Sequence, residues 1–211
     1  MSLRTTAYLA HAAGWPAEGR HILAQSDDRS VVVYQAYGPS IGRFAAENGY
    51  FGGSFRLSRM SWIKPNLLWM MYRSGWGRKE GQEVVLAVRI ERRSFNLILS
   101  QAVHSTFKPG LYTDHDAWKK AVAESDVRLQ WDPDHDPSGA PLRRRAIQLG
   151  LRGEVLAKYA REWIVEIEDV TDFVHEQHQH VVSRRFDQLM VPEEEPYSVE
   201  AGPTRTRLEL A

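Results

Sequence analysis

The segment covering residues 59–76 combines large aromatic rings with cations more densely than either burial or solubility requires. It holds three tryptophans, one tyrosine and the three cations Arg59, Lys64 and Arg73. Rings beside guanidinium or ammonium groups bind flat anionic ligands, such as nucleotides, by stacking and by charge-assisted hydrogen bonds. The segment therefore predicts a binding or catalytic cleft in which these cations contact a phosphate or a carboxylate.

A helix is expected to gather the rings of this segment. Pro65 suits the first turn of a helix over residues 66–73. On that helix Trp69 and Tyr72 would share one face, where they could stack on a ligand ring. The alternative stays open that the rings face the core while the neighbouring cations extend along them to water.

Glu162 is a candidate catalytic carboxylate, because it opens a strand in which acidic and apolar residues alternate. A carboxylate there could act on an electron-deficient sugar carbon or orient a ribose hydroxyl. Glu166 and Glu168 lie on the same face of that strand. An exposed acidic face would therefore explain all three residues equally well.

Three further clusters hold side chains that can bind metals or phosphate. They are residues 132–136, which contain three aspartates and a histidine, the histidines within 175–180, and the arginine run 143–145. Aspartate and proline also dominate ordinary turns, and short polar or charged runs are usually solvated. We therefore expect no metal site. The chain also lacks the phosphate-loop, dinucleotide-fingerprint, nucleophile-elbow and zinc-helix motifs, which argues against Rossmann-type dehydrogenases and several other enzyme classes.

Composition limits the partners of the chain. Its 211 residues have a formal net charge of zero, so any anion binding must come from a local patch. Neutrality and the lack of a wide basic stripe weigh against long nucleic acids. Cysteine is absent, which excludes disulfides and thiolate chemistry. No apolar run approaches the roughly 20 residues that span a bilayer, and the N-terminus does not resemble a signal peptide, so we expect a cytoplasmic protein without membrane partners.

The pattern of elements indicates an α+β fold, a single domain with a mixed or antiparallel β core and short flanking helices. Hydrophobic periodicity and turn residues predict strands over residues 30–37, 83–90, 127–131, 145–151 and 162–170. They predict helices over residues 41–48, 66–73, 93–103, 114–124 and 153–159. Residues 132–141 are expected to form a polar loop. We expect residues 1–29 to be a loosely attached arm, 30–190 the globular domain and 191–211 a disordered tail.

Several sequence blocks occur together in this chain, at residues 33–37, 59–65, 68–76, 82–86, 127–133, 147–151 and 159–171. Together they resemble the bacterial and fungal family called domain of unknown function 4291. The tryptophan-rich block is the most specific of them. The name of the family implies no activity.

The order of elements also resembles that of the ADP-ribosyltransferase superfamily. Residues 34–37, Tyr-Gln-Ala-Tyr, would stand for its first motif and residues 162–165, Glu-Trp-Ile-Val, for its last. The arginine or histidine usual in the first motif is replaced by Gln35. This resemblance implies NAD as a substrate, Gln35 and Glu162 as catalytic residues, and ligand contacts from Tyr34 and Tyr37.

Two classes of function remain open on this evidence, beside a plain scaffold whose rings are all core. The first is an ADP-ribosyltransferase-like enzyme in which Tyr37, Trp69 or Tyr72 stacks on a ring of NAD and the cations hold its pyrophosphate. Glu162 would then stabilise the positive charge that develops at the ribose carbon. The second is a non-enzymatic module that binds a nucleotide or single-stranded nucleic acid by stacking bases on the aromatic segment.

Overall fold

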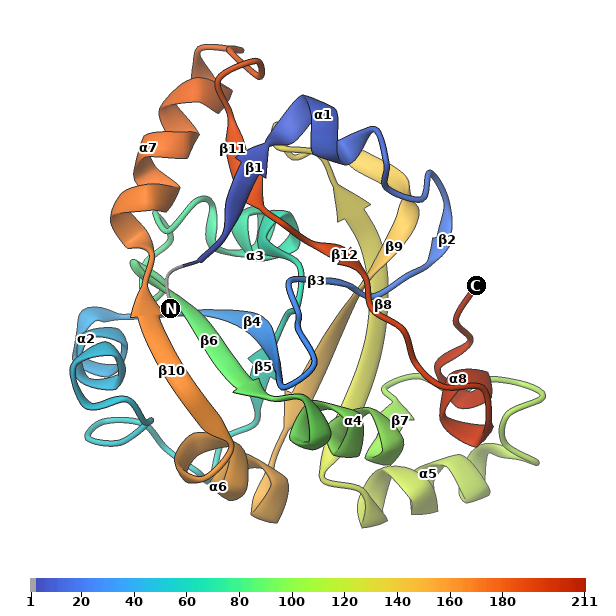
Figure 1. Ribbon diagram of the computed structural model, residues 1–211. Helices are drawn as coiled ribbons and strands as arrows, with labels where there is room; N and C mark the ends of the chain where they lie inside the picture. Colours follow the sequence, from blue (N-terminus) through green and yellow to red (C-terminus); the bar gives the residue numbers. More distant parts are fainter. Residues whose placement is uncertain (1–2) are drawn as a thin grey trace.

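The structure is a computed structural model that describes residues 3–211 (Figure 1). The elements of its first half are β1 (Thr5–Ala7), α1 (Tyr8–Ala12), β2 (Gly19–Arg20), β3 (Leu23–Ala24), β4 (Ser30–Tyr37), α2 (Pro39–Asn48), β5 (Ser61–Ile63), α3 (Leu67–Ser74), β6 (Val84–Glu91) and α4 (Arg92–Gln101). Those of its second half are β7 (Ala102–His104), α5 (His115–Glu124), β8 (Val127–His135), β9 (Pro141–Leu151), α6 (Gly153–Arg161), β10 (Ile164–Asp169), α7 (Thr171–Val182), β11 (Met190–Pro192), β12 (Glu195–Pro196) and α8 (Pro203–Leu208).

Two main sheets make up the β core. One is antiparallel, with strand order β10-β6-β4. The other has the order β2-β9-β8-β7, with β5 paired to β9, and it mixes parallel and antiparallel neighbours. Short helices flank both sheets in one compact domain (Figure 1). The expected α+β class with a mixed or antiparallel core is confirmed.

The near-continuous apolar sequence of β6 follows from its central place, because both of its faces are covered. Successive side chains of a strand point to opposite faces. Leu86 and Val88 accordingly enter one buried cluster, whereas Val85 and Ala87 enter a second cluster that packs around α3. A central strand of this kind has no polar face, which explains why its sequence does not alternate.

A short segment around β5 connects the two sheets. Ser61 to Ile63 pair with β9 of the mixed sheet. The next residue, Lys64, exchanges backbone hydrogen bonds with Tyr34 of β4, with N–O distances of 2.6 and 3.2 Å. Since this connection passes between the sheets, the side chains of β4, β5 and β9 converge where the sheets meet.

The expected polar loop over residues 132–141 is mostly strand instead. β8 continues to His135 and β9 begins at Pro141, so only the turn between them remains. Within this hairpin Arg144 and Asp134 form a buried ion pair, with Nη2 and Oδ2 2.7 Å apart. From the sequence, Asp134 was interpreted as part of a solvated turn and Arg144 as part of a solvated charge run. The sequence did not reveal the ion pair because the two residues face each other across the hairpin.

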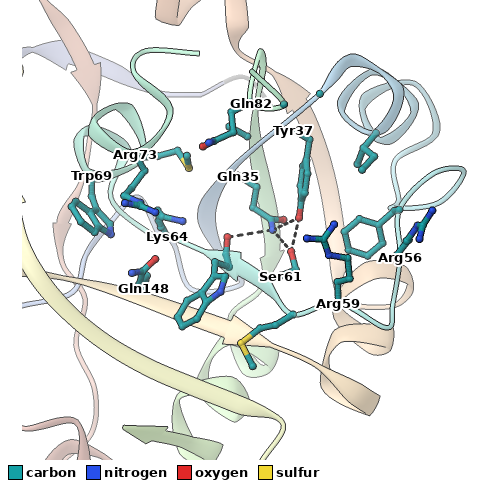
Figure 2. Close-up of a pocket in the computed structure, with 18 of the residues that line it drawn as sticks. Gln35, Tyr37, Arg56, Arg59, Ser61, Lys64, Trp69, Arg73, Gln82 and Gln148 are labelled. Atoms are coloured by element: carbon teal, nitrogen blue, oxygen red, sulfur yellow. Dashed lines mark hydrogen bonds between the residues drawn. The ribbon is translucent and has the colours of Figure 1, made fainter. Parts of the chain in front are cut away.

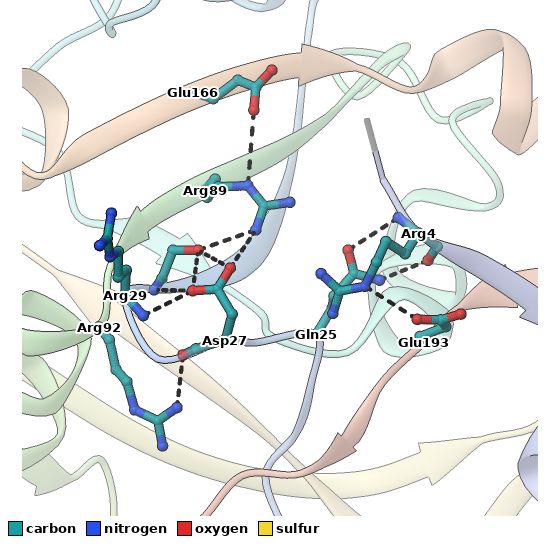
Figure 3. A network of polar contacts seen from close by, with 9 residues as sticks. Arg4, Gln25, Asp27, Arg29, Arg89, Arg92, Glu166 and Glu193 are labelled. Atoms are coloured by element: carbon teal, nitrogen blue, oxygen red, sulfur yellow. Dashed lines mark hydrogen bonds and ion pairs between the residues drawn. The ribbon is translucent and has the colours of Figure 1, made fainter. Parts of the chain in front are cut away.

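The ends of the chain also differ from the expected loose arm and disordered tail. β1 pairs with β11 and β3 with β12, so the two ends hold each other (Figure 1). Arg4 Nε lies 3.1 Å from a carboxylate oxygen of Glu193, and the Gln25 amide bonds both backbone polar groups of Arg4 (Figure 3). Strands of two or three residues leave no periodic pattern, which is why the sequence did not reveal them.

The histidine-containing region after residue 170 is α7, where the sequence pattern indicated no element. Only Val174 and Gln177 of this helix are buried, so its apolar period is too weak to recognise. Across residues 3–211 no helix combines the length and the hydropathy needed to cross a membrane.

Candidate functional site

A cavity of about 1020 Å³ lies where β4, β5 and β9 converge, bounded by α3 and the loop over residues 52–60 (Figure 2). Its volume is at the upper end of the range of small-molecule sites. We call it the cleft. Six of the nine residues proposed from the sequence line it: Gln35, Tyr37, Arg59, Lys64, Trp69 and Arg73.

A hydrogen-bond network fixes the floor of the cleft. Tyr159 donates its hydroxyl proton to Gln35 Oε1 at 2.7 Å. This contact orients the Gln35 amide so that Nε2 donates to Ser61 Oγ at 2.7 Å and to Tyr37 Oη at 2.9 Å. The two hydroxyl oxygens are themselves 2.5 Å apart. Gln35 therefore positions Tyr37 and Ser61 as a pair (Figure 2).

The floor has one hydroxyl proton left to donate to a ligand. Burial raises the pKa of Tyr37 to about 12, although the hydrogen bonds from Ser61 and Gln35 oppose the increase. Tyr37 therefore stays protonated at neutral pH, and the Tyr37–Ser61 pair carries two hydroxyl protons. One proton lies between the two oxygens. The other is available for an acceptor atom in the cleft.

Lys64 is a buried cation on the wall of the cleft. Its relative exposure is 5%, and among the described residues no carboxylate forms an ion pair with it. Burial lowers the pKa of Lys64 to about 8, the nearby Arg73 adds to the decrease, and Asp132 opposes it. The ammonium group is therefore mostly charged at neutral pH, although burial without a partner is costly.

The cleft is strongly cationic in a chain of zero net charge. Arg56, Arg59, Lys64 and Arg73 line it, against Asp132 as the carboxylate among the described lining residues. The difference is 4 − 1, or three positive charges. Asp132 is already engaged, because it accepts hydrogen bonds from the amides of Gln130 at 2.9 Å and Gln148 at 2.8 Å.

Trp69 contributes a buried donor to the same wall as Lys64. The side chain is only 3% exposed, and its indole Nε1 has no hydrogen-bond partner within the described structure. Its ring stacks with those of Tyr72 and His135, at centroid distances of 5.4 and 5.3 Å. Asn66 caps α3 by accepting from Trp69 N, which fixes the helix that presents this ring.

The other three proposed residues lie outside the cleft lining. Tyr34 is fully buried in the cluster around α3, next to the Glu194 carboxyl. Tyr72, 44% exposed, lines a separate cavity of about 320 Å³ beyond the Trp69 ring. Glu162 is exposed at the C-terminal end of α6, just before the edge strand β10, and does not line the cleft.

Sequence reasoning also missed lining residues. Ser61 lies within the aromatic segment and Arg56 just before it, so both could have been found there. Gln130 and Gln148 enter from β8 and β9, and no local pattern marks them, because only strand pairing aligns them with the cleft. Asp132, also on β8, was noticed in the cluster 132–136 but was interpreted as part of a solvated turn. Metal ligands do not accumulate in the cleft or elsewhere, since no group of three or more histidine, aspartate or glutamate side chains in residues 3–211 could hold an ion.

Comparison with known proteins places the cleft within the span of one family match. The family described as "Domain of unknown function (DUF4291)" matches residues 21–197, a span that includes every residue lining the cleft. Among curated proteins, none matches this chain.

Proposed function

The chain belongs to the family of domain of unknown function 4291, whose description assigns no activity, and we therefore propose a function from the cleft itself: it binds a nucleotide-type anionic ligand. The observation that carries this proposal is the buried, unpaired Lys64 within a cationic cleft of a neutral protein. Burial of a charge is tolerated where a ligand supplies the counter-charge. A cytoplasmic location, where nucleotides are plentiful, belongs to the same proposal.

Each group of lining residues has a role in this proposal. Lys64 and Arg73 hold a phosphate, because charge-assisted hydrogen bonds to phosphate are short and strong. Trp62 offers a ring surface against which a base or nicotinamide packs, and Trp69 offers its unpaired indole N–H. The spare hydroxyl proton of the Tyr37–Ser61 pair meets an acceptor oxygen of the sugar or phosphate.

In its enzymatic form the proposal has NAD as the substrate of an ADP-ribosyltransferase-like reaction. Such a reaction needs negative charge beside the ribose carbon as its bond to nicotinamide breaks. Among the described lining residues Asp132 is the carboxylate that can supply it. Gln35 would then position the floor hydroxyls against the ribose, and Glu162 would have no contact with the reacting atoms.

A thermal-shift titration tests the binding proposal. NAD, ADP-ribose and a short single-stranded oligonucleotide are titrated into the protein and into Lys64→Met at two salt concentrations. A ligand that binds only the folded state raises the apparent stability, so even modest affinity is detected. We expect a shift with NAD or ADP-ribose that is reduced in Lys64→Met and unchanged in the control Lys120→Met, whose exposed side chain on α5 lies outside the cleft.

The outcomes separate the alternatives. A shift with the oligonucleotide alone, lost at high salt, would instead support the single-stranded nucleic-acid module. No shift with any of the three would contradict the proposal. If NAD binds, release of nicotinamide by the wild type but not by Asp132→Asn would support the enzymatic form, whereas equal release by both would remove Asp132 from it.

A further inference from the structure

We propose that the cleft contains two separate anion subsites and that its ligand is a nucleotide carrying at least two phosphate groups. The inference rests on the proposed function and adds the class of ligand. It comes from the way the four cations divide between the two sides of the floor network. Figure 2 shows Lys64 and Arg73 on one side of Gln35, Tyr37 and Ser61, and Arg56 and Arg59 on the other.

The first subsite combines three donors that lack protein acceptors. Lys64 and Arg73 both line the cleft, and they are close enough for the charge of Arg73 to lower the pKa of Lys64. Trp69, from the first turn of α3, adds a buried indole N–H without a partner. Two cations and a neutral donor that all lack acceptors fit the several oxygens of one phosphate group.

The second subsite is a turn that the aromatic core holds at the other side of the cleft. Phe55 packs against Phe51 and Tyr37, with ring centroids 4.9 and 5.9 Å apart, and its backbone N donates to Gly52 O at 2.9 Å. Arg59 N then donates to Arg56 O at 3.2 Å, which closes the turn. Both guanidinium groups line the cleft without an ion pair in the described structure.

The middle of the cleft fits the sugar that would connect two phosphates. The Tyr37–Ser61 pair has one hydroxyl proton to donate. A ribose oxygen or an ester oxygen of a phosphate accepts such a proton. A phosphate–ribose–phosphate unit therefore meets donors along its whole length, whether it is a free nucleoside bisphosphate or the phosphorylated end of a strand.

Charge matching leads to the same ligand class. The described lining residues have three net positive charges, four cations against Asp132. A phosphate monoester carries about 1.5 to 2 negative charges at pH 7. One such group leaves the cleft positive, and two neutralise it.

Isothermal titration calorimetry with two probes tests the inference. Adenosine 5′-monophosphate and adenosine 3′,5′-bisphosphate are titrated into the wild type, into Arg56→Ala/Arg59→Ala, and into the charge-matched control Arg29→Ala/Arg43→Ala. All four arginines are exposed, and the control pair lies outside the cleft, so each variant should fold. A 5′-phosphorylated dinucleotide, which joins two nucleosides through a phosphodiester, separates a strand end from a free nucleotide.

We expect the bisphosphate to bind the wild type at least tenfold more tightly than the monophosphate. Arg56→Ala/Arg59→Ala should reduce the bisphosphate affinity to about that of the monophosphate and leave the monophosphate almost unchanged. The control pair should behave as the wild type does. Tighter binding of the dinucleotide than of the bisphosphate would identify a strand end as the source of the ligand, and the reverse order a free nucleotide.

Other results would overturn the inference. If the two probes bind equally, or if the bisphosphate loses no affinity in Arg56→Ala/Arg59→Ala, the second subsite is absent, while monophosphate binding still supports the proposed function. If no adenine nucleotide, NAD or ADP-ribose binds, the proposed function fails together with the inference.

Discussion

At the scale of single residues, Lys64 is placed where stability alone would not put a lysine. Its ammonium group is buried without a carboxylate in ion-pair distance among the described residues, and Arg73 repels it. An apolar residue of similar length would avoid this cost. Positions at which a protein accepts lower stability are often those that function requires.

Replacement of Lys64 by methionine should therefore stabilise the fold, by roughly 1–3 kcal/mol at pH 7. The folded-state pKa of about 8 lies below the ordinary lysine value of 10.5 that applies in the unfolded state. Below pH 8 both states hold the proton and the folded state bears the whole cost. Between pH 8 and 10.5 the folded state releases the proton while the unfolded state keeps it, so the wild type gains stability as pH rises and the advantage of the variant shrinks.

Urea unfolding of wild type and Lys64→Met at pH 7 and pH 10 measures this difference. The exposed Lys120→Met, which loses only a surface ion pair with Glu124, serves as the control and should change stability little at either pH. A variant less stable than the wild type at pH 7 would mean that Lys64 is a structural residue with a partner. The argument for a ligand-binding role would then lose its main support.

At the scale of elements, α3 depends on a residue far away in the sequence. Leu67 N donates to Glu194 Oε1 at 2.8 Å and Asn66 Nδ2 donates to Glu194 Oε2 at 2.9 Å. Trp15 Nε1 in turn donates to the backbone oxygen of Glu194 at 2.8 Å. The segment between β11 and β12 therefore fixes the helix that carries Trp69 into the cleft.

Glu194 should also make the free energy of unfolding decrease as pH rises. Burial, aided by the charge of Asp134, raises its pKa well above the usual value, although the hydrogen bond from Leu67 N opposes the increase. From about pH 4.5 upward the unfolded state loses the proton that the folded state retains, so the stabilising contribution falls as pH rises towards the raised pKa. In Glu194→Gln this decline should disappear.

The free energies of unfolding of wild type and Glu194→Gln, measured by urea between pH 4.5 and pH 8, test this expectation. The difference between the two proteins should be largest at the acid end and should narrow as pH rises. A constant difference over the whole range would show that Glu194 does not titrate there. Exposed Glu195→Gln, one position further on, is the matched control.

Strong local signals made some elements predictable. β4 was predicted at its observed bounds, Ser30–Tyr37, because it is a run of β-branched and aromatic residues. α3 was predicted within one residue at each end, since Asn66 caps it and Gly75 ends it in a left-handed conformation. β7 was assigned to the end of a helix, because residues 102–104 become a strand only by pairing with β8.

At the scale of the whole molecule, the cleft combines near and distant parts of the chain. The proposed residues that line the cleft lie in two continuous stretches, 35–37 and 59–73, so the proximity of residues within each stretch needed no knowledge of the fold. Asp132 and Gln148 reach the cleft only through the pairing of β8 with β9. Glu162 shows the reverse case: the order of elements suggested that it shares a site with Gln35, but at the end of α6 it does not line the cleft.

The last residues of the chain are part of the same core. Leu208 is 0% exposed and belongs to the larger buried cluster, and its backbone oxygen accepts a hydrogen bond from Trp131 Nε1 at 3.0 Å. Leu208→Ala should therefore lower the free energy of unfolding by about 2–4 kcal/mol. The matched change at Leu97, which is 44% exposed on α4, should cost less than about 1 kcal/mol. Denaturant unfolding of both variants makes the comparison. Equal stability of Leu208→Ala and wild type would show that residues 203–208 are detached in solution, because only a docked α8 makes Leu208 a core residue.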